Sequence, residues 1–297
     1  MFLTIFTPIY NRERYVDRLF KTITQQKKKN FEWIIINDGS NDMTRQKIEM
    51  LLANNKFTFP IKFLTVQNGG KQRAINRAVT EATGKYFFIL DSDDMLFPDT
   101  TIKIETWCNE IEKLSNYNQF AGVSGLRVTP DHRYLSGTGD GSKYIDCSNL
   151  NRYKNNLEGD MAEVYKTNLL RKYPFKVFKG ENFVSEETVW NKIAANGFII
   201  RWYLTPIYIG DYLSDGLTKN SNFRDNRNYK GLVYQTKEAI RLKKLKKKIT
   251  AIGYFVYISR QKNISWKIMK QYVKVPKTSL QLCYLVWKIH QIVVKRS

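Results

Sequence analysis

The residues best suited to chemistry are the aspartates of the segment 91–94, which directly follow the apolar run of residues 86–90. Hard divalent cations prefer oxygen ligands, and Mg2+ or Mn2+ bound to a diphosphate usually takes only one or two carboxylates from the protein. An Asp-x-Asp turn at a strand end can therefore offer one carboxylate to a sugar hydroxyl and another to a metal ion. The alternative is a polar turn that caps the following helix.

A second acidic turn, Asp38-Gly39-Ser40, follows the apolar run of residues 31–36. A carboxylate at this position can accept a hydrogen bond from the N–H of a nucleotide base. Gly39 permits a tight turn and a close approach of the ligand. An ordinary β-turn explains the same residues.

Polar side chains also follow the first apolar segment, at Thr7-Pro8 and Tyr10-Asn11. Thr7 and Asn11 offer hydrogen bonds near a predicted helix N-terminus, which is a good place for an anion or for the polar edge of a base. Helix capping by Asn11 explains the pattern equally well.

A glycine-rich turn, residues 68–71, precedes another predicted helix that carries Arg73 and Asn76. Two glycines followed by the cation Lys71 at a helix start suit a phosphate group. The patterns GxxxxGK[ST] and GxGxxG are both absent from the sequence, so neither a P-loop nor a dinucleotide fingerprint is predicted. A solvated helix start is the alternative.

Glu186 and Glu187 stand at the start of an apparent helix, just before Trp190. An acceptor hydroxyl that attacks an anomeric carbon must lose its proton, and a well-placed carboxylate is the usual base. Acidic residues at a helix N-terminus also complement the helix dipole, which is the alternative.

Short apolar strands alternate with helical patterns in the first part of the chain, and this alternation predicts βαβ units and a largely parallel sheet. Strands are expected at residues 2–6, 31–36, 61–65, 86–90, 121–128, 161–165 and 198–203. Both aspartate turns then lie at the carboxyl edge of the sheet, where open α/β sheets bind ligands. The polar, aperiodic residues 129–157 are expected to form an insertion or flexible loop.

The order and spacing of these motifs resemble the family 2 glycosyltransferases with the GT-A fold. The resemblance is dense over residues 1–130 and looser to about residue 220, where the chain is similar to a bacterial subgroup that builds cell-surface polysaccharide. It implies a Rossmann-like, mostly parallel sheet flanked by helices, with residues 1–130 as the nucleotide-binding half and residues 131–220 as the acceptor half. Residues 221–297 would form a basic helical C-terminal extension.

The resemblance further implies an inverting displacement that moves a sugar from a nucleotide diphosphate donor, expected to be a UDP-sugar, to an acceptor hydroxyl, with Mn2+ or Mg2+ as cofactor. Asp93 would ligate the metal ion. The family's acid pair is commonly Glu-Asp, with the Asp four residues before an aromatic residue, and here Glu186 takes that position while Glu187 stays an alternative base. The donor would be bound by Thr7, Pro8, Tyr10, Asn11, Asp38, Ser40, Lys71, Asn76, Asp91 and Ser92.

Positive charge is concentrated in the C-terminal part of the chain. The formal net charge is +22, and residues 230–297 contain 17 Lys or Arg against one acidic residue, Glu238. The three cysteines are sparse and far apart, which argues against a disulfide framework and for a reducing compartment. The N-terminus lacks the basic region and cleavage site of a secretory signal, so a cytoplasmic location is expected.

The apolar residues 280–294 would form a helix of ~22 Å, which is short for a hydrocarbon core of ~30 Å. Lysines beside Trp and Tyr on amphipathic helices suit an anionic membrane surface. We therefore expect peripheral attachment to the cytoplasmic face of the membrane, with a lipid-linked or glycan acceptor. The alternative is a helical subdomain that packs on the core and leaves a solvated basic face.

Two other function classes stay open. The positive charge favours a non-enzymatic nucleic-acid-binding protein, but the chain has no nucleic-acid motif and the acidic residues 91–94 would repel phosphate, so we expect no nucleic-acid partner. A sugar nucleotidyltransferase is also an α/β protein with catalytic Asp and metal. It normally has a glycine-rich loop after the first strand, and residues 7–14 contain no glycine.

Overall fold

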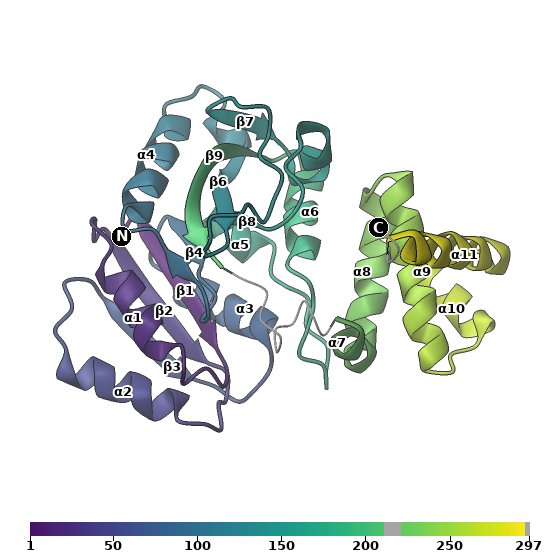
Figure 1. Cartoon of the computed structure of the whole chain (residues 1–297), viewed down its shortest axis with the longest axis horizontal. Helices are drawn as coiled ribbons and strands as arrows, with labels where there is room; N and C mark the ends of the chain where they lie inside the picture. Colours follow the sequence, from purple (N-terminus) through teal and green to yellow (C-terminus); the bar gives the residue numbers. More distant parts are fainter. Residues whose placement is uncertain (211–220, 295–297) are drawn as a thin grey trace. The chain divides into compact units, whose positions relative to one another are not determined.

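The structure is a computed structural model that describes residues 1–210 and 221–294 (Figure 1). The described residues divide into two compact units. Unit 1 comprises residues 1–175 and 189–210, and unit 2 comprises residues 176–188 and 221–294.

A nine-stranded sheet forms the centre of unit 1, within the residues that the structure describes. The strand order is β3-β2-β1-β4-β8-β6-β9-β5. The ninth strand, β7, lies outside this order and pairs with β9. The strands are β1 (Leu3–Ile9), β2 (Phe31–Asn37), β3 (Ile61–Thr65), β4 (Tyr86–Ile89), β5 (Met95–Leu96), β6 (Phe120–Val128), β7 (Tyr144–Cys147), β8 (Met161–Lys166) and β9 (Ile199–Ile209). The predicted strands are confirmed, although β1 extends to Ile9 and so includes Thr7 and Pro8, which were expected to follow it. The short strands β5 and β7 were not predicted.

The sheet is mostly parallel in its first half. Strands β3, β2, β1 and β4 run parallel, whereas β8 runs antiparallel between β4 and β6. The chain moves from β1 through β2 to β3 and then returns to the other side of β1 as β4. This reversal of strand order, between β1 and β4, is where open α/β sheets bind ligands at the carboxyl ends of their strands. The predicted fold class is confirmed.

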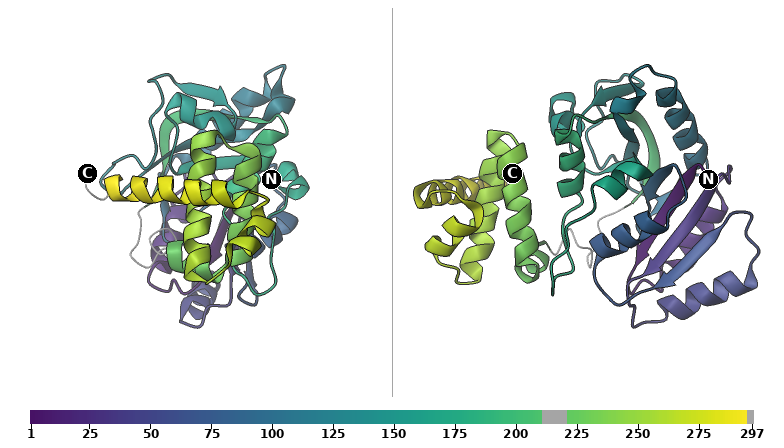
Figure 2. Two further views of the ribbon diagram at one scale, coloured as in Figure 1. Left: turned by 90° about the vertical axis from the view of Figure 1, so that its right-hand side faces the viewer. Right: turned by 180° about the vertical axis from the view of Figure 1, so that it is seen from behind.

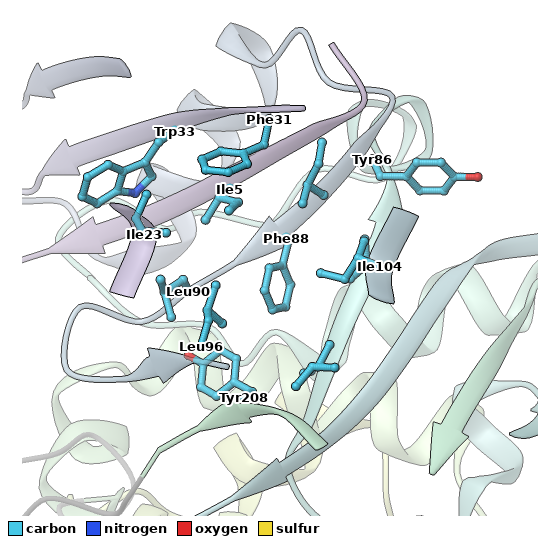
Figure 3. Close-up of a cluster of buried hydrophobic side chains, with 14 of the residues drawn as sticks. Ile5, Ile23, Phe31, Trp33, Tyr86, Phe88, Leu90, Leu96, Ile104 and Tyr208 are labelled. Atoms are coloured by element: carbon cyan, nitrogen blue, oxygen red, sulfur yellow. The ribbon is translucent and has the colours of Figure 1, made fainter. Parts of the chain in front are cut away.

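Helices cover both faces of the sheet because apolar side chains point alternately to its two sides. Ile5 and Trp33 belong to the buried cluster that includes side chains of α1, α2 and α4 (Figure 3). Phe6 and Ile34 belong to the cluster that includes side chains of α3, α5 and α6. These helices are α1 (Val16–Thr24), α2 (Thr44–Asn54), α3 (Lys71–Glu81), α4 (Thr100–Glu112), α5 (Thr167–Lys172) and α6 (Glu187–Ala195).

The structure corrects two expectations about unit 1. Asn11 does not cap α1, because that helix begins at Val16 and its N-cap residue is Tyr15, without a side-chain hydrogen bond. Residues 129–157 are not simply a flexible loop, because they contain β7 and the 3-10 helix η2 (Asn149–Asn155). Backbone pairing of β7 with β9 supplies the order that the polar sequence does not reveal.

Unit 2 is helical, and it includes residues 176–188 as well as the C-terminal helices. Glu181 accepts hydrogen bonds from the backbone N–H groups of Lys230 and Gly231 at 2.7 and 2.8 Å. The Arg224 guanidinium lies 3.9 Å from the ring centroid of Phe183. Residues 176–188, predicted as part of the acceptor half, therefore pack with α7 (Ser221–Arg227), α8 (Tyr229–Leu242), α9 (Leu245–Gln261), α10 (Trp266–Val273) and α11 (Lys277–Val294) as one unit.

The turns after β2 and β3 approach each other closely at Gly39. This residue has a φ of +72°, and a Cβ atom at this position would lie 2.7 Å from the backbone nitrogen of Asn68. Only glycine fits both the left-handed conformation and this contact.

We predict that Gly39→Ala lowers the free energy of unfolding by about 2 kcal/mol or more, since the backbone conformation alone costs about 1–2 kcal/mol. Chemical denaturation measures this loss. Gly141→Ala is the matched control, because Gly141 has a φ of +87° and nothing lies within 4 Å of its added Cβ. Equal losses in the two variants would show that the contact between the two turns adds nothing.

Candidate functional site

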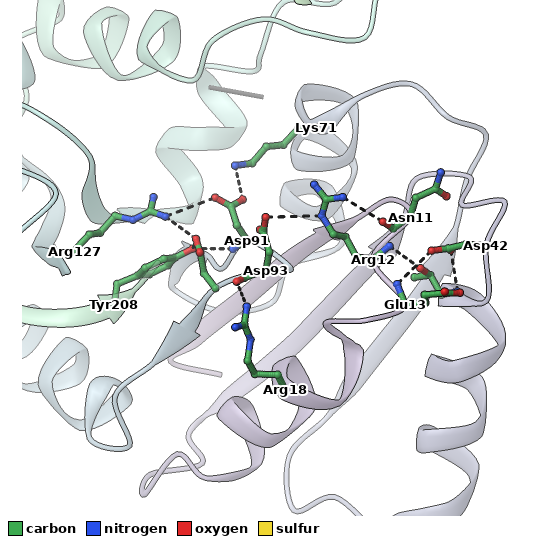
Figure 4. Close-up of polar contacts among 12 residues, drawn as sticks. Asn11, Arg12, Glu13, Arg18, Asp42, Lys71, Asp91, Asp93, Arg127 and Tyr208 are labelled. Atoms are coloured by element: carbon green, nitrogen blue, oxygen red, sulfur yellow. Dashed lines mark hydrogen bonds and ion pairs between the residues drawn. The ribbon is translucent and has the colours of Figure 1, made fainter. Parts of the chain in front are cut away.

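The turn after β4 places two buried or half-buried carboxylates beside cations from other elements (Figure 4). The Lys71 Nζ atom lies 2.5 Å from Asp91 Oδ1, and the Arg127 guanidinium lies 2.6 Å from Asp94 Oδ2. Burial disfavours the charged form of Asp91, but Lys71 and Arg127 outweigh this effect and hold its pKa below the usual value. Burial raises the pKa of Asp94 to about 7, although Arg127 opposes the shift.

Side chains from β6 and β9 also contact the turn of residues 91–94. The Tyr208 hydroxyl donates a hydrogen bond to Asp94 Oδ2 at 2.8 Å and accepts one from the backbone N–H of Asp91 at 2.9 Å. The Arg127 guanidinium lies 4.0 Å from the centroid of the Tyr208 ring. Charge-assisted hydrogen bonds with several partners hold a group in one geometry, so these residues position the aspartate turn.

Asp93 lies in a different electrostatic environment. Burial and the neighbouring charge of Asp91 raise the pKa of Asp93. The Arg12 Nε atom is 3.8 Å from Asp93 Oδ2, and the side chain of Arg18 donates to the backbone carbonyl of Asp93 rather than to its carboxylate. A further positive charge next to this carboxylate would therefore stabilise its ionised form.

Asp38 binds the start of α3. Its two carboxylate oxygens accept hydrogen bonds from the backbone N–H groups of Gly69 and Gly70 at 2.8 and 2.7 Å. Burial raises the pKa of Asp38, and these two hydrogen bonds oppose the shift. The backbone N–H groups at the start of α3 thus bind a carboxylate of this chain. The next residue, Lys71, reaches Asp91.

The loops after β1 and β2 are joined by side chains of Asn11 and Ser40. Asn11 donates its backbone N–H to Ser40 Oγ at 3.0 Å and accepts from the backbone N–H of Asn41 at 2.9 Å. Asp42 accepts from the backbone N–H of Glu13 at 3.3 Å (Figure 4). The loops after all four parallel strands are thus connected at one edge of the sheet.

Several predicted donor-binding residues have their polar atoms engaged inside unit 1. Thr7 is fully buried, and its hydroxyl accepts a hydrogen bond from the Trp33 indole at 3.1 Å. Both polar ends of the Asn76 side chain bond to the backbone of Phe175, at 2.9 Å each. Ser92 is buried as well. The contacts of Thr7 and Asn76 stabilise this edge of the sheet from inside unit 1.

Pro8 is half-buried and lies within β1, whereas Tyr10 directly follows this strand and is 44% exposed. Hydrogen bonds and ion pairs at the sheet edge bring together five of the predicted donor-binding residues: Asn11, Asp38, Ser40, Lys71 and Asp91. Their roles towards a donor stay predictions.

Glu186 and Glu187 belong to unit 2, whereas the residues of the sheet edge belong to unit 1. Glu186 is half-buried. Glu187 is the first residue of α6, and its carboxylate lies 2.6 Å from Lys243 Nζ. Lys243 is the C-cap residue of α8.

Sequence reasoning did not assign a role to Arg12, Asp94, Arg127 or Tyr208. A charged residue inside the apolar strand 120–128 was a signal for Arg127, because a buried charge needs a partner. No local signal marks Tyr208, which lies 114 residues from its hydrogen-bond partner Asp94.

The chain also matches a known protein family. Residues 4–116 match the family model described as glycosyl transferase family 2. Residues 4–116 are a family 2 glycosyltransferase domain. The match includes both aspartate turns and all four parallel strands of the edge.

This domain has relatives in much longer proteins. Chondroitin synthase of Pasteurella multocida is 38% identical over 97 residues, which is 33% of this chain and 10% of that protein. An uncharacterised glycosyltransferase of Rickettsia bellii is 33% identical over 116 residues, 39% of this chain and 16% of that protein. The chain thus spans only a small part of these relatives.

Solved structures share the fold. TarS 1–349 of Staphylococcus aureus in complex with UDP-GlcNAc superposes with a TM-score of 0.62 at 17% identity, covering 98% of this chain and 92% of that one. The mannosyltransferase PcManGT of Pyrobaculum calidifontis, in complex with GDP-Man and Mn2+, gives a TM-score of 0.56 at 16% identity, covering 96% and 86%. The mixed α/β architecture is that of the GT-A fold.

We predict that Arg127→Met lowers the free energy of unfolding by about 3 kcal/mol, because breaking a buried ion pair leaves Asp94 uncompensated. The loss should grow as the pH rises above about 7. The pKa of Asp94 is already raised to about 7 beside Arg127. Without the Arg127 charge the pKa of Asp94 would rise further, so above about 7 the native state of the variant keeps a proton that the unmodified protein has lost, and the difference in stability widens with pH.

Denaturation across the pH range measures the effect of Arg127→Met. Arg133→Met is the matched control, because Arg133 also pairs with an aspartate, at 2.7 Å, but both side chains are well exposed. The control should leave the unfolding free energy unchanged. A pH-independent loss in Arg127→Met would rule out the charge pairing as its cause.

Proposed function

We propose that this protein is an inverting glycosyltransferase that moves a sugar from a nucleotide diphosphate donor, a UDP-sugar, to an acceptor hydroxyl in cell-surface polysaccharide assembly. One observation carries the proposal: the Asp38 turn and the aspartate turn 91–94 are joined through Gly70 and Lys71 at one sheet edge, inside a family 2 domain. The complex of TarS with UDP-GlcNAc and the match to chondroitin synthase support the donor and product classes.

The nucleotide part of the donor is assigned to the Asp38 side of the edge. Asp38 Oδ1 accepts a hydrogen bond from Gly69, and a carboxylate oxygen has two lone pairs, so it has room to accept one from a base N–H. Lys71, at the start of α3, supplies positive charge for the diphosphate, and Asp91 is assigned to a ribose or sugar hydroxyl.

A divalent metal ion, Mn2+ or Mg2+, fits the residues of the aspartate turn. No group of three His, Cys, Asp or Glu side chains converges on one cation position within the described residues. A metal ion bound to a diphosphate needs only one or two protein carboxylates. Asp93 offers a hard oxygen donor whose burial and acidic neighbour favour an added cation. We assign Asp93 as the ligand, and the bound ion would neutralise charge on the diphosphate.

The transfer itself is a single displacement. The acceptor oxygen bonds to the anomeric carbon while the bond from that carbon to the diphosphate oxygen breaks. The acceptor proton passes to a carboxylate, which we assign to Glu186 because it stands four residues before the aromatic residue Trp190, with Glu187 as the alternative. Lys71 stabilises the negative charge that leaves with the nucleotide diphosphate.

We also propose peripheral attachment to an anionic membrane on its cytoplasmic face, where a lipid-linked or glycan acceptor would be found. Among the helices that the structure describes, none is both long and apolar enough to cross a bilayer. The basic C-terminal helices support binding at the surface, since each Lys or Arg near an anionic leaflet contributes about 1 kcal/mol.

The metal assignment predicts that UDP raises the thermal stability of the protein only modestly alone and more strongly with Mn2+. Asp93→Asn should remove the Mn2+-dependent part, which corresponds to at least about tenfold weaker binding. Asp131→Asn is the control, because this exposed aspartate lies outside the site. A Mn2+-dependent shift in Asp93→Asn equal to that of the unmodified protein would refute Asp93 as the metal ligand.

The base assignment predicts that Glu186→Gln keeps UDP-sugar binding but lowers the transfer rate about 10²–10⁴-fold. Glu187→Gln should retain most of the rate, because its carboxylate pairs with Lys243. Transfer assays with measured donor binding separate the two steps. If only Glu187→Gln loses activity, Glu187 is the base; if both variants stay active, the base lies elsewhere.

A further inference from the structure

Helix α11 has apolar side chains on two opposite faces. One face packs on α9 within unit 2: Leu280 and Cys283 are buried, and the Trp287 ring lies 4.9 Å from that of Tyr257. The other face carries five aliphatic side chains that we call the apolar row: Leu282, Leu285, Val286, Ile289 and Ile292. Figure 2 shows α11 lying across the helices of its own unit.

The apolar row is exposed along its whole length. Its side chains are between 43% and 62% exposed, from Val286 to Leu282. Their spacing of three or four residues places them on one side of the helix, opposite Leu280 and Trp287. Single exposed aliphatic residues are normal on a protein surface, but a continuous row on one helix face marks an interaction surface.

The aromatic residues of α11 do not form this surface. Trp287 is half-buried and packs over Gly253 and Tyr257, and Tyr284 is also half-buried. The sequence suggested that Trp and Tyr beside lysines meet the membrane, whereas the structure turns Leu, Val and Ile outward instead.

The charges around the apolar row decide what covers it. Residues 245–297 contain 12 Lys or Arg and no acidic residue. Lys288 lies beside the row and above the Tyr284 ring, at 4.8 Å from its centroid. A second copy of this unit would bring many like charges together, whereas an anionic lipid surface complements them.

The length of α11 sets its orientation towards a bilayer. Its 18 residues correspond to a helix of ~27 Å, and with one apolar face already packed on α9 it cannot be surrounded by lipid. An interfacial helix instead lies in the plane of the membrane, with its apolar face ~5–10 Å into the headgroup and acyl boundary.

We infer that the apolar row of α11 inserts into the interface of an anionic bilayer, while the basic residues of α9, α10 and α11 contact the lipid headgroups. The inference rests on the membrane attachment proposed above and adds its mode, insertion of one aliphatic helix face. Electrostatic adsorption alone would need no such row.

The full-length double variant Leu285→Gln/Ile289→Gln tests the insertion without changing the charge. Cosedimentation with vesicles of phosphatidylcholine and phosphatidylglycerol should show a partition coefficient at least about tenfold lower than for the unmodified protein, since two aliphatic side chains lose their burial. Both side chains are exposed, so the variant should fold normally, which circular dichroism checks. Lys288→Gln should lower binding about fivefold, and only at low salt.

The matched control is Met43→Gln/Met50→Gln, which makes the same kind of change at side chains of unit 1 that are 58% and 54% exposed. It should leave vesicle binding unchanged. Equal binding by the α11 variant and the unmodified protein overturns the inference, as does equally strong binding to vesicles of phosphatidylcholine alone. A dimer in light scattering that the α11 variant converts to a monomer also overturns it, because the row would then be a contact between copies.

Stabilisation by UDP with Mn2+, measured on the same proteins without vesicles, keeps the two proposals separate. Loss of vesicle binding in the α11 variant with an intact UDP shift supports the inference. Vesicle binding by a protein that UDP and Mn2+ do not stabilise also supports the membrane inference. That result would contradict only the proposed donor binding.

Discussion

The site depends on the compensation of negative charge in one turn. Three aspartates stand within the four residues 91–94, and like charges at such distances repel unless cations lie between them. The cations come from three places: Lys71 from α3, Arg127 from β6 and Arg12 from the loop after β1. The turn can therefore keep its conformation only when the βαβ units of the first half and the antiparallel second half of the sheet have all assembled.

Compensation is uneven, and the three carboxylates therefore lie in different electrostatic environments. Asp91 has close partners and a lowered pKa, whereas Asp94 is held by Arg127 and Tyr208 as part of the framework. Asp93 has a raised pKa and its guanidinium neighbour is 3.8 Å away. A single carboxylate that gains from an added cation suits a metal ion carried in by a diphosphate, and does not suit a metal ion caged by protein ligands alone.

The fold and the edge of the site could be predicted because both follow from local patterns. Apolar runs marked β1 to β4, and parallel strands must place their following turns on one edge. The partners of those turns could not be predicted, because Tyr208 and Arg127 reach them only through the pairing of distant strands. The contact of Asn76 could not be predicted either, because its side-chain amide donates a hydrogen bond to the backbone carbonyl of Phe175, 99 residues away in the sequence.

Unit 2 links two of the proposals. Glu181 binds the N-terminus of α8, and Lys243 pairs with Glu187, so the segment with the candidate bases is fastened to the C-terminal helices. The apolar row of α11 belongs to the same unit. The proposed base, Glu186, and the helix proposed to bind the membrane, α11, therefore belong to the same compact unit.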